Sequence, residues 1–230
     1  VVNKKPSDLK LVLAGVGAAG TACARILMQY GVKNIIGYDR HGALHNGRDY
    51  GDNESKIWFA KNTNPTEITG SLNERIEGAD MFLGLAAPSL LTIDDVSSMS
   101  SDAIVFALSN PDPEIWPEEI PGNVLVMATG RTDYPNQINN SLCFPGLFRG
   151  VLDVRSREIT DSMKISAAEG IASVIPDSNV SADFIIPSVF DQNVARIVAD
   201  CVAESAIRSG VALRRRRSRD EVYATFRSKR

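Results

Sequence analysis

The sequence lacks any long apolar run. No stretch approaches the roughly 20 apolar residues that a helix needs to cross a bilayer. The segment Val1 to Pro6 also lacks the apolar centre of a signal peptide. These absences argue against a membrane protein. The first residue is Val rather than Met, from which we expect a fragment or a processed product.

Cysteine and histidine are scarce. The three cysteines, Cys23, Cys143 and Cys201, are far apart and odd in number, so they form neither a C-x-x-C motif nor a disulfide framework. Free thiols fit a reducing cytoplasm, which is the predicted location. His41 and His45 are four residues apart without a pattern of acidic partners, so no metal site is predicted there.

An excess of one charge is also missing. The 25 basic and 28 acidic residues give a net charge of −3, which argues against a nucleic-acid or membrane-surface binder. The basic run Arg214 to Arg217 has no interleaved aromatic residues, which argues against nucleic-acid binding. We predict a basic helical tail over residues 211–230 that is either solvated or in contact with a domain absent from this chain. Because 43% of the 230 residues are hydrophobic, the chain can bury a substantial core.

What the sequence does have is a glycine-rich turn between a strand and a helix. The apolar run Leu11 to Ala14 leads directly into the motif G-x-G-x-x-G. Its first glycine allows a tight turn, its second lets a pyrophosphate approach the backbone, and its third lets the helix lie close to the sheet. The helix start offers unpaired N–H groups to phosphates. The predicted phosphate-binding residues are Gly15, Gly17, Ala18, Ala19 and Gly20.

An acidic residue completes this pattern. Asp39 follows a second apolar run, Asn34 to Tyr38, and stands nineteen residues after Gly20. A carboxylate at this place can accept both adenosine ribose hydroxyls and would repel a 2′-phosphate, so the sequence predicts NAD in preference to NADP. Arg40 is also a predicted cofactor contact, and Arg40 together with Arg48 leaves NADP possible.

Short apolar runs alternate with helical patterns along the chain. The predicted strands are residues 9–14, 34–38, 79–86, 103–108 and 124–128. The predicted helices are residues 21–30, 57–62, a short helix opened by the capping box Ser71 to Glu74, and residues 160–175 and 190–209. This order predicts a doubly wound α/β fold with a mostly parallel, Rossmann-like sheet and C-terminal helices. Residues 1–210 are predicted to form one dinucleotide-binding domain.

The ends of the later strands carry two further segments. Ser109-Asn110-Pro111 follows one strand, and T-G-R-T-D-Y-P-N-Q-I-N-N, residues 129–140, follows another. With the glycine motif, these segments resemble the cofactor-binding domain of malic enzymes of the shorter prokaryotic type, over roughly residues 1–210. The resemblance implies that the whole enzyme oxidatively decarboxylates (S)-malate to pyruvate and CO2, with reduction of NAD or NADP.

The resemblance also assigns roles to individual residues. Asn110 and Asn139 would line the nicotinamide end of the cofactor, and Asn110 would also reach the substrate. Asn140 would hydrogen-bond malate, and Ala86 would contact the cofactor.

Three other residues of the 129–140 segment could be an anion clamp, an acid and a base. For Arg131, Asp133 and Tyr134 we favour instead a buried polar network that shapes the loop.

The catalytic half of a malic enzyme is expected to lie elsewhere. In the family, the catalytic tyrosine and lysine and the acidic metal ligands lie upstream of the segment where this chain begins. We therefore expect no catalytic residue and no metal ligand here, with Mn or Mg bound mainly by an absent N-terminal domain. The fragment alone would be inactive, and the enzyme would be a homodimer or homotetramer acting on malate and pyruvate. A non-catalytic nucleotide-sensing module and a different two-domain NAD-dependent dehydrogenase stay open as alternatives.

Overall fold

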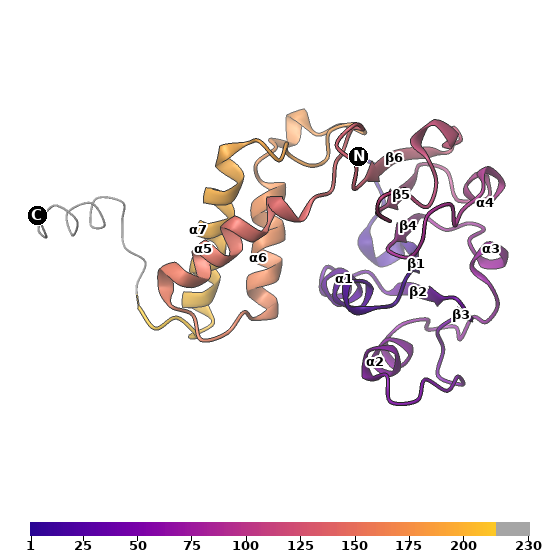
Figure 1. Cartoon of the computed structure of the whole chain (residues 1–230), viewed down its shortest axis with the longest axis horizontal. Coiled ribbons are helices and arrows are strands. Elements are labelled where there is room, and N and C mark those ends of the chain that lie inside the picture. Colours follow the sequence, from indigo (N-terminus) through magenta and orange to yellow (C-terminus); the bar gives the residue numbers. More distant parts are fainter. Residues whose placement is uncertain (215–230) are drawn as a thin grey trace, which may run out of the picture. The chain divides into compact units, whose positions relative to one another are not determined.

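The structure, a computed structural model, describes residues 1–214 and consists of two compact units (Figure 1). The first unit comprises residues 1–138 and 180–185. The second comprises residues 139–179 and the chain from residue 186 onward. The predicted tail beyond Arg214, with most of the basic run, lies outside the described residues.

The first unit is built on a six-stranded sheet of order β3-β2-β1-β4-β5-β6. Its strands are β1 (Lys10–Ala14), β2 (Asn34–Asp39), β3 (Gly42–Ala43), β4 (Met81–Gly84), β5 (Ala103–Ala107) and β6 (Val124–Thr129). All neighbouring strands are parallel except the pair β2 and β3. The predicted doubly wound, mostly parallel α/β fold is confirmed. Strand β3 was not predicted, because two residues show no periodicity.

Helices of the first unit cover both faces of this sheet. Helices α1 (Ala18–Gln29) and α2 (Glu54–Asn62) contribute to one core, and α3 (Leu72–Arg75) and α4 (Ile93–Ser97) contribute to the other. Strand β1 feeds both cores, because alternate residues point to opposite faces: Leu11 and Leu13 into the first, Val12 and Ala14 into the second. Burial on both faces explains why the strands are continuously apolar.

Local signals in the sequence set several helix ends. The capping box of Ser71 and Glu74 opens α3, as predicted. An equivalent box of Thr92 and Asp95 opens α4, a helix that was not predicted. Gly31 follows the end of α1 with a φ of +94°, a conformation that glycine adopts readily. Short 3₁₀ helices span Pro6–Asp8, Pro117–Glu119, Asn140–Leu142 and Asp177–Asn179.

The second unit is a helical assembly of α5 (Phe144–Val154), α6 (Asp161–Ala172) and α7 (Gln192–Arg208), with its own apolar core. Two glycines of α5 allow close packing on α7, because a Cβ at Gly146 or Gly150 would collide with α7 backbone oxygens and valine side chains. In the described part of the chain, no helix is both long and apolar enough to span a membrane.

Candidate dinucleotide site

The turn between β1 and α1 needs its three glycines for different reasons. Gly15 has a φ of +98°, and a Cβ there would collide with the carbonyl of Leu85. A Cβ at Gly20 would collide with the carbonyl oxygen of Gly15, within the turn itself. A Cβ at Gly17 would meet nothing within 4 Å. The fold therefore requires Gly15 and Gly20, whereas Gly17 leaves open space that a ligand can occupy.

This open space belongs to a cleft of about 590 Å³ at the carboxyl ends of β1, β2 and β4. Its lining includes eight predicted cofactor residues: Gly15, Gly17, Ala18, Ala19, Gly20, Asp39, Arg40 and Ala86. Helix α1 starts in this cleft, and its N-cap, Gly17, provides no side-chain cap. The first amides of the helix can therefore donate to an anion. The cleft thus combines open space beside Gly17 with backbone donors of the kind that bind phosphates.

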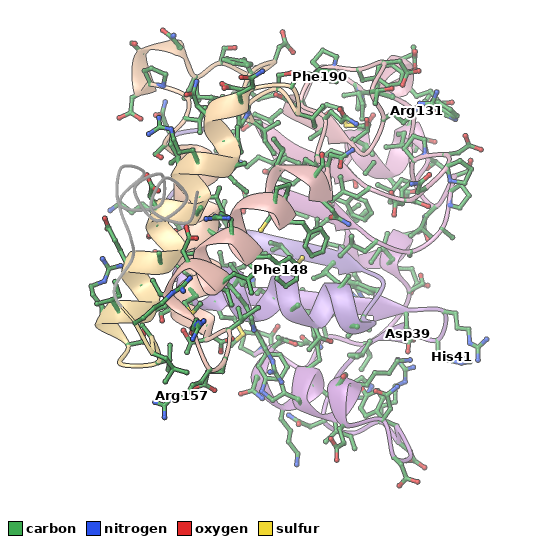
Figure 2. All side chains as sticks on the ribbon, turned by 60° about the vertical axis from the view of Figure 1, so that its left-hand side comes forward. Asp39, His41, Arg131, Phe148, Arg157 and Phe190 are labelled. Atoms are coloured by element: carbon green, nitrogen blue, oxygen red, sulfur yellow. The ribbon has the colours of Figure 1, made fainter. Side chains whose placement is uncertain are left out.

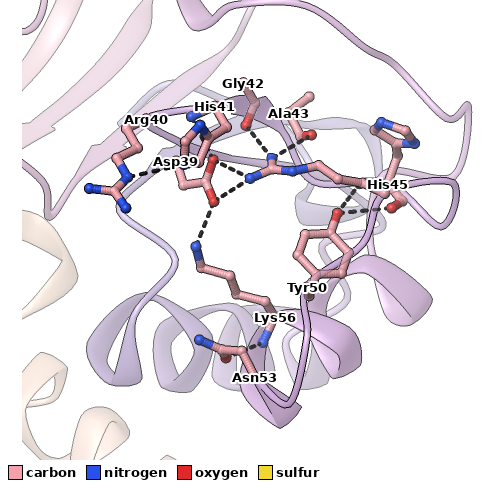
Figure 3. A network of polar contacts seen from close by, with 10 residues as sticks. Asp39, Arg40, His41, Gly42, Ala43, His45, Tyr50, Asn53 and Lys56 are labelled. Atoms are coloured by element: carbon pink, nitrogen blue, oxygen red, sulfur yellow. Dashed lines mark hydrogen bonds and ion pairs between the residues drawn. The ribbon is translucent and has the colours of Figure 1, made fainter.

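Asp39 lies at one end of the cleft within a network of polar contacts (Figure 3). The Nη2 atom of Arg48 lies 2.7 Å from both carboxylate oxygens, and Lys56 Nζ lies 2.6 Å from Oδ2. The backbone N–H of His41 donates to Oδ1 at 2.8 Å. Burial alone would raise the pKa of Asp39, but these hydrogen bonds outweigh it and lower the pKa to about 2. Asp39 is therefore ionised at neutral pH.

Lys56 is a site residue that the sequence analysis missed. It lies on α2, where its backbone N–H donates to the capping side chain of Asn53, and its side chain lines the cleft beside Asp39. Arg48, by contrast, is not among the described residues that line the cleft. Its guanidinium also donates to the carbonyls of Gly42 and Ala43, which ties β3 to Asp39. Arg48 therefore acts as a structural clamp behind the carboxylate, whereas Lys56 pairs with the carboxylate from within the cleft.

Two further groups near Asp39 are exposed, the guanidinium of Arg40 and the imidazole of His41. Arg40 lines the cleft and donates from Nε to Nε2 of His41 at 3.1 Å. His41 points away from the sheet beyond the end of β2 (Figure 2). His45 Nδ1 lies 4.0 Å from Glu67 Oε2. Within residues 1–214, no group of three or more histidine, cysteine, aspartate or glutamate side chains is arranged to hold a metal ion.

A second, smaller cleft of about 420 Å³ lies at the carboxyl ends of β5 and β6. Its lining residues are Ser109, Asn110, Pro111, Gly130, Arg131, Thr132 and Asp133. Asn110 therefore lies in a cleft of its own and not among the residues that line the first one.

The polar network of the β6 loop differs from the prediction. Arg131 donates to both oxygens of Asp133 at 2.9 and 2.8 Å and lies over the ring of Trp116, while Tyr134 donates to Glu118 at 2.6 Å. The network was predicted to be buried, which is wrong: Asp133 is exposed and Arg131 and Tyr134 are partly exposed. The loop can order these side chains at the surface, because Arg131 pairs with the oppositely charged Asp133 and the hydroxyl of Tyr134 donates to the carboxylate of Glu118.

Asn139 and Asn140 belong to the second unit. The side chain of Asn139 caps the 3₁₀ helix Asn140–Leu142 by accepting from the backbone N–H of Ser141 at 2.9 Å. Asn140 is exposed. The roles of both in binding nicotinamide and malate stay predictions.

Comparison with known proteins gives a consistent result. The family profile described as "Malic enzyme, NAD binding domain" matches residues 1–207. An NAD-dependent malic enzyme of Geobacillus stearothermophilus is 53% identical over 92% of this chain and 44% of its own length. An NADP-dependent malic enzyme of Halomonas elongata is 38% identical over 93% of this chain and 54% of its own length.

Solved structures agree with the sequence relatives. The crystal structure of the malic enzyme from Pyrococcus horikoshii Ot3 superposes with a TM-score of 0.87 and is 41% identical, over 99% of this chain and 54% of that one. The chain thus spans about half the length of the relatives it matches.

Proposed function

The chain belongs to the malic enzyme family, and on this premise we propose that it supplies the dinucleotide site of an enzyme converting (S)-malate to pyruvate and CO2. The observation that carries the proposal is the cleft around Gly17, where open space adjoins the uncapped start of α1 and a carboxylate at the end of β2. When bound, the dinucleotide would accept the hydride from C2 of malate. The chain's own residues bind and orient it.

The phosphate end of the site rests on the backbone. Gly15, Gly17 and Gly20 keep the turn close to the cleft, and the first amides of α1 donate to the pyrophosphate. We expect Ala18, Ala19 and Ala86 to contact the cofactor through their backbone as well, because their side chains are too small to fill the cleft. This arrangement needs no charged side chain at the phosphates.

The adenosine end of the site determines which dinucleotide is preferred. The carboxylate of Asp39 accepts ribose hydroxyls and disfavours a 2′-phosphate, which supports NAD as the preferred cofactor. Lys56 and Arg48 pair with the same carboxylate, so the three side chains together carry one positive charge. That net charge, together with Arg40 on the cleft wall, supports binding of NADP as a second, weaker cofactor.

The substrate end of the site is assigned to asparagines. Asn110 in the second cleft would contact the nicotinamide ribose and malate, Asn139 would line the nicotinamide, and Asn140 would hydrogen-bond malate. A neutral amide orients an anion through fixed donors and does not titrate. The family resemblance places the Mn or Mg ligands and the proton-transferring residues upstream of the segment that this chain represents, and we propose the same arrangement here.

The same proposal includes the binding partners, the oligomeric state and the cellular location of the whole protein. The partners would be malate and pyruvate, the protein would form a homodimer or homotetramer, and it would work in the cytoplasm. The three cysteines are free thiols, which supports a reducing compartment.

The deciding experiment measures pyruvate release from malate with Mn, using the longest polypeptide that the gene encodes and offering NAD and NADP separately. We expect pyruvate with NAD and slower release with NADP. Calorimetric titration of the present chain with NAD is the companion measurement, and we expect binding without turnover. Binding by the longer polypeptide without pyruvate would contradict the proposal and favour a nucleotide-sensing module.

A further inference from the structure

A buried carboxylate links the two clefts described above, the one around Gly17 and the one around Asn110. The side chain of Glu114 is 0% exposed. Its Oε1 accepts a hydrogen bond from the backbone N–H of Ala86 at 3.1 Å, and its Oε2 accepts one from the backbone N–H of Ser109 at 3.0 Å. One side chain therefore holds the loop that follows β4 with one oxygen and the loop that follows β5 with the other.

These two loops belong to different clefts. Ala86 lines the larger cleft, which contains the glycine turn and Asp39. Ser109 lines the smaller cleft, which contains Asn110. The backbone around Glu114 adds to the link, since its carbonyl accepts from Leu91 N at 3.0 Å and the carbonyl of Pro113 accepts from Ser89 N at 3.0 Å. Residues 113 and 114 thus hold the loop after β4 against the loop after β5, in addition to the pairing of the two strands.

A glycine at the end of β4 provides the space that this carboxylate occupies. Gly84 ends β4, and a Cβ there would collide with the carboxyl carbon and both carboxylate oxygens of Glu114. Burial raises the pKa of Glu114, and the hydrogen bonds from Ser109 and Ala86 offset part of that increase. A buried carboxylate costs free energy that an apolar side chain of similar volume would not cost. Its hydrogen bonds to one lining residue of each cleft indicate that this buried carboxylate positions the two clefts.

We propose that Glu114 is a positioning residue that fixes the distance between the two clefts, so that they hold the two halves of one dinucleotide. This inference rests on the proposed function. It deepens that function by naming how the adenosine half and the nicotinamide half are kept in register. Glu114 itself does not touch the ligand.

The test compares a whole dinucleotide with half of one. Glu114→Gln keeps the shape of the side chain but replaces one acceptor with an NH2 group, which cannot accept from a backbone N–H. We expect the Kd of the full chain for NAD to rise about tenfold, because one of the two loops is released and the two clefts no longer hold a whole dinucleotide in register. The Kd for AMP, which needs only the Asp39 end of the larger cleft, should stay within about twofold. Glu169→Gln, an isosteric change at an exposed position of α6, is the matched control.

Each outcome decides between defined alternatives. An unchanged Kd for NAD in Glu114→Gln would overturn the inference, and so would equal losses of NAD and AMP binding, because those indicate general damage. If the wild-type chain itself does not bind NAD, the proposed function fails instead. Glu114→Asp keeps the charge but has a side chain that is one methylene group shorter. We expect the same changes in the Kd values for NAD and AMP in this second variant. If neither variant folds, hydrogen exchange of the wild-type chain decides: NAD should slow exchange at Ala86 and Ser109 together, and an unchanged rate at Ser109 would overturn the inference.

Discussion

The charge of Asp39 is maintained by its neighbours, and this has a consequence at low pH. Its pKa is lowered from 3.8 to about 2 by hydrogen bonds from Lys56, Arg48 and His41, despite burial. A lowered folded-state pKa means that the ionised form stabilises the fold above the unfolded pKa, and that this contribution is lost as the pH falls toward the folded pKa. We therefore expect the free energy of unfolding to fall between about pH 4 and pH 2 more steeply in the wild type than in Asp39→Asn.

Urea unfolding at several pH values measures this difference, with exposed Asp52→Asn as the control. Parallel curves for the wild type and Asp39→Asn below pH 4 would contradict the role of the ion pairs. The same variant should bind NAD more weakly and discriminate less against NADP, because it has lost the charge that repels a 2′-phosphate.

Lys56 is expected to have the opposite effect on selectivity. Its ammonium lies in the larger cleft beside Asp39, where a 2′-phosphate would be placed. Lys56→Gln should raise the Kd for NADP by about tenfold, as expected for the loss of a charge-assisted hydrogen bond, and change the Kd for NAD less. Titration calorimetry with both dinucleotides checks this. Lys61→Gln, at an exposed position of the same helix, should leave both values unchanged. Equal losses for NAD and NADP would refute the assignment.

Of the two charged residues Asp39 and Lys56, only Asp39 could be predicted from the sequence. Asp39 could be found because it follows an apolar strand at a set distance from the glycine motif. Lys56 could not, because its Nζ atom reaches Asp39 only through the packing of α2 on the sheet. The same applies to Glu114: it follows the Ser109-Asn110-Pro111 segment closely, but only the fold brings the backbone N–H of Ala86, 28 residues away, to its carboxylate.

Among the elements, the β1–α1 turn allows binding to be separated from folding. At Gly17 an added Cβ meets no atom within 4 Å, whereas at Gly20 it meets the backbone of the turn. Gly17→Val should therefore fold normally and lose NAD binding, because its side chain occupies the space of the pyrophosphate. Gly20→Val should lower the free energy of unfolding by about 1–3 kcal/mol, as expected for overpacking. Thermal unfolding and NAD titration of both variants check this pair. Normal NAD affinity in Gly17→Val would refute the site.

Helix α5 shows why part of the second unit could not be predicted. Large apolar residues lie on both of its sides: Leu147 and Val154 are buried with Gly146 and Gly150, whereas Phe144, Phe148 and Leu152 are exposed. Figure 2 labels Phe148. The large apolar side chains therefore do not mark the buried side, and the sequence pattern does not show how this helix packs. Helices α6 and α7 could be predicted because they are longer and follow residues that start helices, Thr160 and Asp191, which cap them in the structure.

On the scale of the whole molecule, the chain passes between its two units three times, and Asn136 secures one of the returning segments. This buried residue donates from Nδ2 to the carbonyls of Met127 and Ala182 at 3.0 and 2.7 Å, and its Oδ1 accepts from Ile185 N at 2.9 Å. Residues 180–185 are thereby held against β6 as part of the first unit. The φ of +54° at Asn136 also suits asparagine better than most residues.

Removal of this side chain should therefore loosen a defined segment. Asn136→Ala leaves two carbonyls and one N–H without their partner, so we expect the free energy of unfolding to fall by about 2–3 kcal/mol. Hydrogen exchange should accelerate at Phe184 and Ile185. Asn136→Asp, which keeps the acceptor for Ile185 but loses both donors, should behave similarly, and Asn62→Ala on α2 is the control. Unchanged exchange at Phe184 and Ile185 in Asn136→Ala would contradict this role of Asn136, because the segment would then be protected without the three hydrogen bonds that its side chain makes.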